Sequence, residues 1–251
     1  MPAPQRNPWL LRLPPPRGAA ADAPPASAPR LTLVCLAPAG ASASLFHAWA
    51  PALPADVELL PVELPGRGTR LREAPCARME PLVAALQAAL APALPPGRPW
   101  ALLGCSMGAW VGYALAQRLA AAGRPPAKLY SLVARSPTLA GAHHDPDPTR
   151  LSALTRPEDF WPAFERRYGP NPLLASPSMR AAMLPGLLAD FEVLEAWAGV
   201  APGPAARLPC PLAAVGALGD GRYSRDQLAA WGRDCAPPGA YQERWFEGGH
   251  R

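Results

Sequence analysis

The stretch WALLGCSMGAWVGYALAQRLAAAG, residues 100–123, decides the fold of this 251-residue chain. A short apolar run leads into Gly104-Cys105-Ser106-Met107-Gly108, and a helical pattern then continues to a Gly. This is the G-x-S-x-G pattern in the strand–turn–helix context that it requires. Glycines on both sides remove side chains that would collide with the neighbouring strand and helix. We therefore expect Ser106 to stand on a strained turn at the carboxyl end of a strand, with its hydroxyl exposed as a nucleophile.

Strand and helix patterns alternate on both sides of this stretch. Buried apolar runs predict strands at 31–36, 57–64, 100–103, 129–134, 212–218 and 243–246. Apolar residues at three- and four-residue steps, with their stop signals, predict helices at 80–94, 107–122 and 226–235. Such alternation predicts an α/β fold with a mainly parallel sheet and helices on both faces.

The alternation breaks over residues 137–206, where several short helical segments occur and no convincing strand is found. The segment is rich in large apolar residues, among them Phe160, Trp161, Phe164, Met183, Leu187, Phe191, Leu194 and Trp197. An all-helical insertion in an α/β chain predicts a lid over the site. The alternative is an ordinary helical layer of the core.

Composition and charge argue against several classes of protein. The net charge of +5 is spread along the chain without a run of five basic residues, which argues against nucleic-acid binding but allows an acidic protein partner. No apolar run reaches about 18 residues, so no standard transmembrane helix is expected. The 5 cysteines are scattered without metal-ligand spacing, so we expect reduced thiols and no metal site.

Residues 1–30 are rich in proline and alanine and contain a single acidic residue, Asp22. This composition predicts a disordered segment ahead of a domain at 31–251. An organellar targeting segment is the alternative, since such segments are rich in Arg and poor in acids, and a cytoplasmic location is otherwise expected. Trp9, Leu10 and Leu11 could pack back onto the domain.

A serine nucleophile needs a base, and the chain has four histidines. In the α/β-hydrolase architecture the chain order is Ser, then Asp or Glu, then His. His47 precedes the serine, and the pair at 143–144 lies in a polar turn. His250 follows the last apolar strand and two glycines, which makes it the predicted base.

The base in turn needs a carboxylate that orients it. Asp220 lies just past the carboxyl end of the strand at 212–218, at the sheet edge where the nucleophile is expected. It is the predicted acid, and Asp226 is the next candidate. The structural alternative for Asp220 is a turn residue, because Asp220-Gly221 is also a turn signal.

The oxyanion that forms during acyl transfer needs two fixed backbone donors. The first is the amide of Met107, which directly follows the nucleophile. The second is expected in the small-residue loop after the first strand, Pro38-Ala39-Gly40-Ala41-Ser42, where we favour the amide of Ala39.

Beyond these residues, the chain resembles the type II thioesterases of polyketide and nonribosomal-peptide assembly lines, which are relatives of the fatty-acid synthase thioesterase II. The matching segments are LVCLAPAGASASLFHAW (33–49), VELLPVELPGRGTRL (57–71), LLGCSMGAWVGYALAQRL (102–119), RYGPNP (167–172), MLPGLLADFEVLEAW (183–197), SRDQLAAW (224–231) and FEGGH (246–250). They span nearly all of residues 31–250.

The resemblance implies an α/β-hydrolase fold with a lid at about 137–206 and hydrolysis of acyl thioesters carried on the phosphopantetheine arm of acyl or peptidyl carrier proteins. The usual role is the clearing of stalled acyl groups. Within the resemblance, the nucleophile maps to Ser106, the acid to Asp220, the base to His250 and the oxyanion amides to Met107 and Ala39. The substrate carries the phosphopantetheine, so no cofactor, nucleic acid or membrane is implied, and a monomer is expected.

Three departures from the family pattern stand out. Cys105 occupies a position where the family usually has His, and we expect this thiol to pack rather than react. Ala41 replaces the second of two glycines in the first loop, and its methyl group is expected to narrow the acyl site. Only Arg251 follows His250, so we expect a truncated chain end and a loosely held base.

Two other functions compete with a thioesterase acting on carrier proteins. One is an esterase that acts on small oxygen esters, and the other is a non-catalytic fragment that binds carrier proteins. The ratio of thioester to oxygen-ester hydrolysis distinguishes a thioesterase from such an esterase. Labelling of Ser106 by a fluorophosphonate distinguishes an enzyme from a non-catalytic fragment.

Overall fold

A computed structural model of the chain describes residues 7–11, 29–94 and 96–250, so most of the predicted disordered segment, 1–6 and 12–28, lies outside the described residues. At its centre is a six-stranded sheet in the order β2-β1-β3-β4-β5-β6, and every neighbouring pair is parallel. The strands are β1 (Leu31–Leu36), β2 (Val57–Val62), β3 (Trp100–Cys105), β4 (Leu129–Leu132), β5 (Leu212–Ala217) and β6 (Tyr241–Phe246). The predicted α/β class and parallel sheet are confirmed.

The helices alternate with the strands as expected and differ from the predicted bounds by a few residues. The α-helices are α1 (Met79–Leu90), α2 (Met107–Ala121), α3 (Pro157–Tyr168), α4 (Pro177–Ala196) and α5 (Arg225–Ala229). The 3-10 helices are η1 (Ala43–Ala52), η2 (Gly68–Arg70), η3 (Pro137–Leu139), η4 (Ala142–His144), η5 (Leu151–Ala153), η6 (Pro172–Leu174), η7 (Pro204–Ala206) and η8 (Ala230–Asp234). Strand β4 ends earlier than predicted because Val133, directly after it, has a positive φ of 48° that leaves the extended region.

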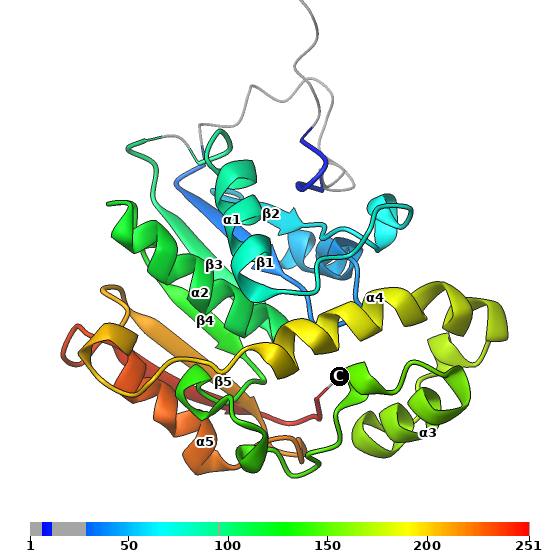
Figure 1. Ribbon diagram of the computed structural model, residues 1–251. Coiled ribbons are helices and arrows are strands. Elements are labelled where there is room, and N and C mark those ends of the chain that lie inside the picture. The colour runs from blue at the N-terminus through cyan, green and yellow to red at the C-terminus, as the bar shows by residue number, and fades with distance from the viewer. Residues whose placement is uncertain (1–6, 12–28, 95, 251) are drawn as a thin grey trace, which may run out of the picture.

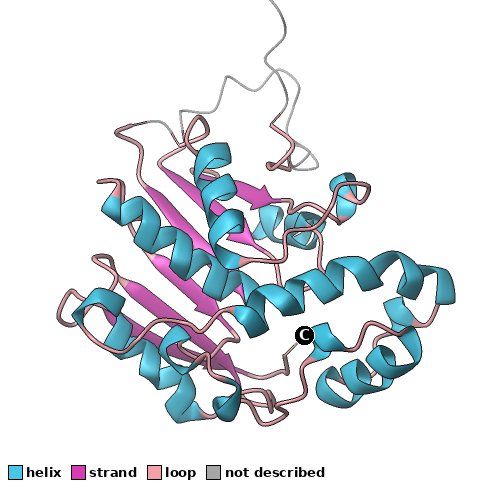
Figure 2. Ribbon diagram, viewed as in Figure 1, coloured by secondary structure: helices cyan, strands magenta, loops and turns pink. Residues whose placement is uncertain are grey.

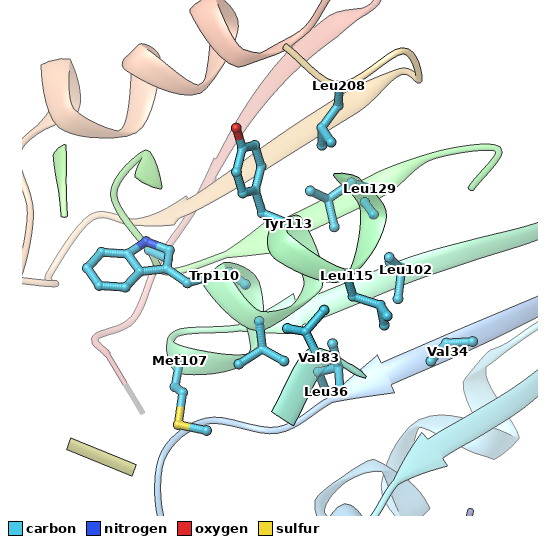
Figure 3. Close-up of a cluster of buried hydrophobic side chains, with 14 of the residues drawn as sticks. Val34, Leu36, Val83, Leu102, Met107, Trp110, Tyr113, Leu115, Leu129 and Leu208 are labelled. Carbon is cyan, nitrogen blue, oxygen red and sulfur yellow. The ribbon is translucent and has the colours of Figure 1, made fainter. Parts of the chain in front are cut away.

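One face of the sheet carries α1, α2 and the α5–η8 segment, and the main core lies beneath them (Figures 1 and 2). Alternate strand residues point toward α2, so that its side chains pack on β1, β3 and β4 (Figure 3). Figure 3 labels Val34, Leu36, Val83, Leu102, Met107, Trp110, Tyr113, Leu115, Leu129 and Leu208 in this cluster. Tyr113 of α2 also meets Trp231 of η8, with ring centroids 5.8 Å apart, which joins the two halves of this layer.

The opposite face is covered by η1 over β1 and β3. Leu33, Cys35 and Leu103 point to this side and pack with Phe46 of η1. Ala41, in the loop before η1, packs against the same cluster. Its methyl group is partly buried there, and the expectation that it narrows the acyl site stays a prediction.

Residues 7–11 lie against the outer strand β2, which confirms that Trp9, Leu10 and Leu11 pack back onto the domain. Leu10 forms an antiparallel bridge with Val62, and the Glu63 amide donates to the Trp9 carbonyl over 2.8 Å. The guanidinium of Arg70 stacks on the Trp9 ring at 4.2 Å. These contacts cover an edge strand that would otherwise leave its backbone groups unpaired.

Residues 137–206, which we call the lid, contain α3, α4 and five 3-10 helices, as the prediction of an all-helical insertion requires. In Figure 1 the lid extends from the carboxyl edge of the sheet, and α4 runs along that edge. The lid has an apolar cluster of its own, separate from the sheet core: Leu151, Phe160, Trp161, Ala163, Phe164, Leu174, Leu184, Leu187 and Phe191. It is therefore a second packing unit that rests on the first.

The strand order places a crevice at the carboxyl edge between β1 and β3. The chain passes from β1 outward to β2 and then returns to β3 on the other side of β1. Loops that follow β1 and β3 diverge at such a switch point and leave room for a ligand. Among the described residues, none of the helices is long and apolar enough to span a bilayer.

Candidate active site

Ser106 stands on a sharp turn between β3 and α2, with φ 51° and ψ −114°. This backbone conformation is strained for a residue with a side chain and exposes the hydroxyl at the sheet edge. A Cβ atom on Gly104 would lie 2.1 Å from the Gly108 carbonyl oxygen, and one on Gly108 would lie 2.2 Å from the Leu36 carbonyl oxygen. Both glycines of the motif are thus required by close backbone approach, as the sequence predicts.

The structure brings the three predicted chemical groups together. His250 Nε2 lies 3.0 Å from Ser106 Oγ, and His250 Nδ1 lies 2.7 Å from Asp220 Oδ2. The Asp220 side chain is fully buried, while that of His250 keeps 17% of its surface exposed. Asp226, the alternative acid, lies exposed in the first turn of α5. These distances match the geometry of a Ser–His–Asp triad, in which the carboxylate orients the imidazole.

The loop that carries His250 hydrogen-bonds to its neighbour, and the expectation of a loosely held base stays a prediction. The Gly219 amide donates to the Gly248 carbonyl over 2.8 Å, which ties this loop to the one that carries Asp220. The second oxygen of Asp220 accepts the Arg222 amide over 2.8 Å, so both carboxylate oxygens are occupied. The Tyr168 ring lies beside the imidazole, with centroids 5.5 Å apart. Sequence reasoning missed Tyr168 because it lies 82 positions from His250 and meets it only in three dimensions.

The predicted oxyanion donors flank Ser106 from two loops. The Met107 amide is the first of α2, where helix geometry provides no internal acceptor. The Ala39 amide donates to no acceptor within the described ranges, whereas the next amide, that of Gly40, donates to Asp190 Oδ2 over 2.7 Å. The Gly40 amide is therefore already hydrogen-bonded to Asp190, and the Ala39 amide stays the predicted second oxyanion donor.

A buried ion pair joins the lid to the loop after β1. Arg67 donates to Asp190 through two bonds of 2.8 and 2.5 Å, and both side chains are less than a tenth exposed. The same Asp190 holds Gly40, so one carboxylate of α4 fixes both the LPGRG segment and the oxyanion loop. Both residues lie in segments that match the family, but no pattern in the sequence indicates a role for Arg67 or Asp190. Their pairing across 123 residues is visible only in the fold.

A cavity of about 320 Å³ opens from Ser106 toward the lid. Its wall includes apolar residues, namely Met107, Trp110, Val133, Ala134, Ala140, Phe191 and Leu194. It also includes charged residues, namely Arg135, Asp145, Asp147, Arg150, Arg167, Glu195 and Arg222. A more open hollow of about 800 Å³ meets it at Tyr168 and His250 and leads outward along Arg166 and Gly249.

Cys105, beside the nucleophile, is not an alternative nucleophile. Burial raises the pKa of its thiol to about 12, and the Asp220 carboxylate adds to the effect. The thiolate is the reactive form of cysteine, so this side chain stays a neutral, packing group. Among the described residues, no group of three or more His, Cys, Asp or Glu side chains is placed to hold a metal ion.

Comparison with known proteins is in agreement with this geometry. Residues 31–251 match the model of the Thioesterase domain. The chain is 32% identical over 228 residues to the thioesterase PikA5 of Streptomyces venezuelae, a match that covers 90% of this chain and 76% of PikA5. It is 33% identical over 223 residues to the AMB antimetabolite synthetase AmbE of Pseudomonas aeruginosa. That match covers 88% of this chain but spans only 10% of AmbE.

Solved structures give the same result. RedJ, a thioesterase from the prodiginine pathway of Streptomyces coelicolor, superposes with a TM-score of 0.77 at 31% identity, covering 92% of this chain and 89% of RedJ. The type II thioesterase BorB of the borrelidin biosynthetic cluster superposes with a TM-score of 0.75 at 25% identity, covering 98% and 90%. The chain therefore belongs to the thioesterase-domain family and, as its sequence resemblance predicts, stands among the type II thioesterases of polyketide and nonribosomal-peptide pathways.

Proposed function

We propose that this thioesterase uses Ser106, His250 and Asp220 to hydrolyse acyl thioesters that are carried on the phosphopantetheine arm of carrier proteins, and so clears stalled acyl groups from a synthase. The observation that carries the proposal is the hydrogen-bonded chain from Ser106 Oγ through His250 to Asp220 on a strained nucleophile turn. It stands in a chain of the thioesterase-domain family.

In the first step Ser106 Oγ attacks the thioester carbonyl carbon while His250 Nε2 takes the hydroxyl proton. Asp220 keeps the proton on Nδ1 and stabilises the imidazolium that forms. The resulting oxyanion accepts bonds from the Met107 and Ala39 amides. The C–S bond then breaks, and His250 returns the proton to the departing pantetheine sulfur, which leaves an acyl ester on Ser106.

In the second step water replaces the thiol. His250 takes a proton from the water molecule as the water attacks the acyl ester. The second tetrahedral oxyanion accepts hydrogen bonds from the same two amides. When the C–O bond breaks, the proton passes to Ser106 Oγ. The products are a carboxylic acid and the free enzyme.

The two cavities support a division of the substrate between them. The inner cavity, which has apolar residues in its wall, suits the acyl group, because burial of apolar surface stabilises it there. The open hollow outside His250 suits the polar arm, which must continue to a carrier protein at the surface. The net charge of +5 favours association with an acidic partner.

The test compares three substrates that share one acyl group: an acylated carrier protein, the N-acetylcysteamine thioester and the corresponding oxygen ester. We expect kcat/KM to be highest for the carrier protein and at least about tenfold lower for the oxygen ester. Ser106→Ala is the matched control and should hydrolyse none of them. Equal rates on the oxygen ester and the thioesters would indicate a general esterase instead. Failure of the wild-type chain to label with a fluorophosphonate would indicate a non-catalytic protein.

A further inference from the structure

The lid contacts the proposed base directly through one side chain. Tyr168, the last residue of α3, lies beside His250 with ring centroids 5.5 Å apart and planes tilted by 37°. Burial raises the pKa of the Tyr168 phenol, so the ring meets the imidazole as a neutral group. Tyr168 also borders both the inner cavity and the outer hollow, where these meet at His250.

The lid holds this ring in place from one side. Tyr168 packs on Phe164 at 5.1 Å and stacks with Phe191 of α4 at 6.0 Å. Helix α3 ends at this point because Gly169 adopts a φ of 75°, a value that favours glycine, and its amide closes the last turn on the Glu165 carbonyl over 2.7 Å. The position of Tyr168 is therefore set by the aromatic cluster and the end of the helix.

The loop of the acid holds the ring from another side. The Arg222 guanidinium lies 5.4 Å from the Tyr168 ring centroid. The backbone amide of the same residue donates to Asp220 Oδ1, and its side chain forms a 2.5 Å ion pair with Asp145 at the start of the lid. Arg222 thus joins the acid, the aromatic ring and the lid.

We propose that Tyr168 is a positioning residue for the base, through which the lid keeps the His250 imidazole in the plane that joins Asp220 to Ser106. This inference rests on the proposed function, in which His250 is the base. The hydrogen bonds to Asp220 and Ser106 define two points of the imidazole, and contact with the Tyr168 ring restricts its rotation about the line between them. Loss of this ring lets the imidazole turn out of line, and proton transfer from Ser106 slows.

The test uses Tyr168→Leu, which removes the ring, and Tyr168→Phe, which keeps it. The readouts are the rate of Ser106 labelling by a small fluorophosphonate and the kcat and KM for acetyl-N-acetylcysteamine, a substrate too short to depend on the lid cluster. We expect Tyr168→Leu to lower labelling and kcat by about tenfold with KM within about twofold, because catalysis is sensitive to small misplacements. Tyr168→Phe should restore both rates to within about twofold of wild type.

Phe160→Leu is the matched control, since Phe160 is buried in the same lid cluster and packs on Phe164 and Phe191 without lining the cavity. It should loosen the lid but leave labelling close to wild type. Equal losses in Phe160→Leu and Tyr168→Leu would show a general lid effect and overturn the proposal, as would labelling of Tyr168→Leu within about twofold of wild type.

Arg222→Met provides a second test should Tyr168→Leu fail to fold, because it removes the guanidinium that supports the ring and keeps the amide that holds Asp220. We expect labelling to fall by about threefold, and an unchanged rate would count against the proposal. A wild-type chain that neither labels nor hydrolyses would overturn the proposed function itself, which is a different outcome from a labelled wild type with an unaffected Tyr168→Leu.

Discussion

The sheet body and the lid are stabilised in different ways. The body packs apolar strand residues against α1, α2 and η1, and its central strands are buried on both faces. The lid has a separate aromatic cluster, and its Ala140 and Val193 also join the core of the body. Polar contacts add to this packing, among them the buried Arg67–Asp190 pair, the Asp190–Gly40 bond and the Arg135–Asp145–Arg222 ion pairs.

Because of this difference, the two regions are expected to affect stability and catalysis to different extents. Apolar packing is non-directional and tolerates small shifts, whereas a bidentate ion pair or a backbone hydrogen bond sets position and orientation. The polar contacts named above end at loops around the site: the loop after β2, the oxyanion loop, the loop of the acid and the segment beside β4. Changes in the body are therefore expected to alter stability, and changes at these contacts to alter turnover as well.

The largest effect is expected where the body provides the nucleophile. Ser106→Ala should lower kcat by about 10³-fold or more, because the attacking oxygen is lost. The midpoint of thermal unfolding should not fall, since the hydroxyl bonds only to His250 among the described residues. Steady-state hydrolysis of an acyl thioester measures the first quantity and a melting curve the second. Turnover within tenfold of wild type would assign the nucleophile to another residue.

The buried pair between lid and body should give the next largest effect. Asp190→Ala leaves the Arg67 guanidinium buried without its partner, which is expected to cost about 3–5 kcal/mol of unfolding free energy. The double variant Arg67→Met/Asp190→Leu should recover most of this stability, because apolar pairs can replace buried ion pairs. Its kcat should stay low, since Gly40 beside the Ala39 donor has lost its acceptor. Urea unfolding and kcat are measured on the same samples, and full recovery of both would limit the role of Asp190 to stability.

Asp234 is a buried carboxylate of the body that can be compared with Asp190 of the lid. Unlike Asp190, it has no salt bridge among the described residues. Burial raises the pKa of Asp234 to about 6, while the Ser136 hydroxyl, at 2.6 Å from Oδ2, opposes the shift. Between about pH 4 and pH 6 the folded state holds a proton that the unfolded state releases, so this group makes stability fall as the pH rises through that window. Asp234→Asn, which cannot ionise, should be about 3 kcal/mol more stable than wild type at pH 8 and close to it near pH 4. Urea unfolding at the two values tests this, and a stability difference that is independent of pH would contradict it.

The smallest effect is expected at Cys105, in the body beside the nucleophile. A thiol with a pKa of about 12 is protonated at neutral pH, so iodoacetamide should not modify it in the folded protein. Cys105→Ala should retain kcat within about threefold, and Cys105→His, which restores the family pattern, should behave alike. Loss of acyl-enzyme formation in Cys105→Ala, with Ser106 present, would show that the thiol takes part in the chemistry.

Local patterns in the sequence were sufficient to predict the strands, the nucleophile turn and the helical character of the lid. The strand–GCSMG–helix stretch could be predicted because its glycines are required locally, where the backbones of β3, α2 and β1 approach closely. His250 and Asp220 were predicted because parallel strands end at one edge, so residues just past those ends must converge. The coverage of the second sheet face by a 3-10 helix was not predicted, since short 3-10 segments have no clear periodicity.

The sequence by itself determined the order of strands and helices, the nucleophile turn and the residue types of the proposed triad, because each depends on spacing, glycines or the ends of strands. Only the tertiary structure decided how the lid meets the site. The pairing of Arg67 with Asp190, the hold of Asp190 on Gly40 and the contact of Tyr168 with His250 join residues 82 to 150 positions apart. No local pattern specifies which charged or aromatic side chains will meet over such separations, since their partners are chosen by how α3 and α4 pack across the carboxyl edge of the sheet.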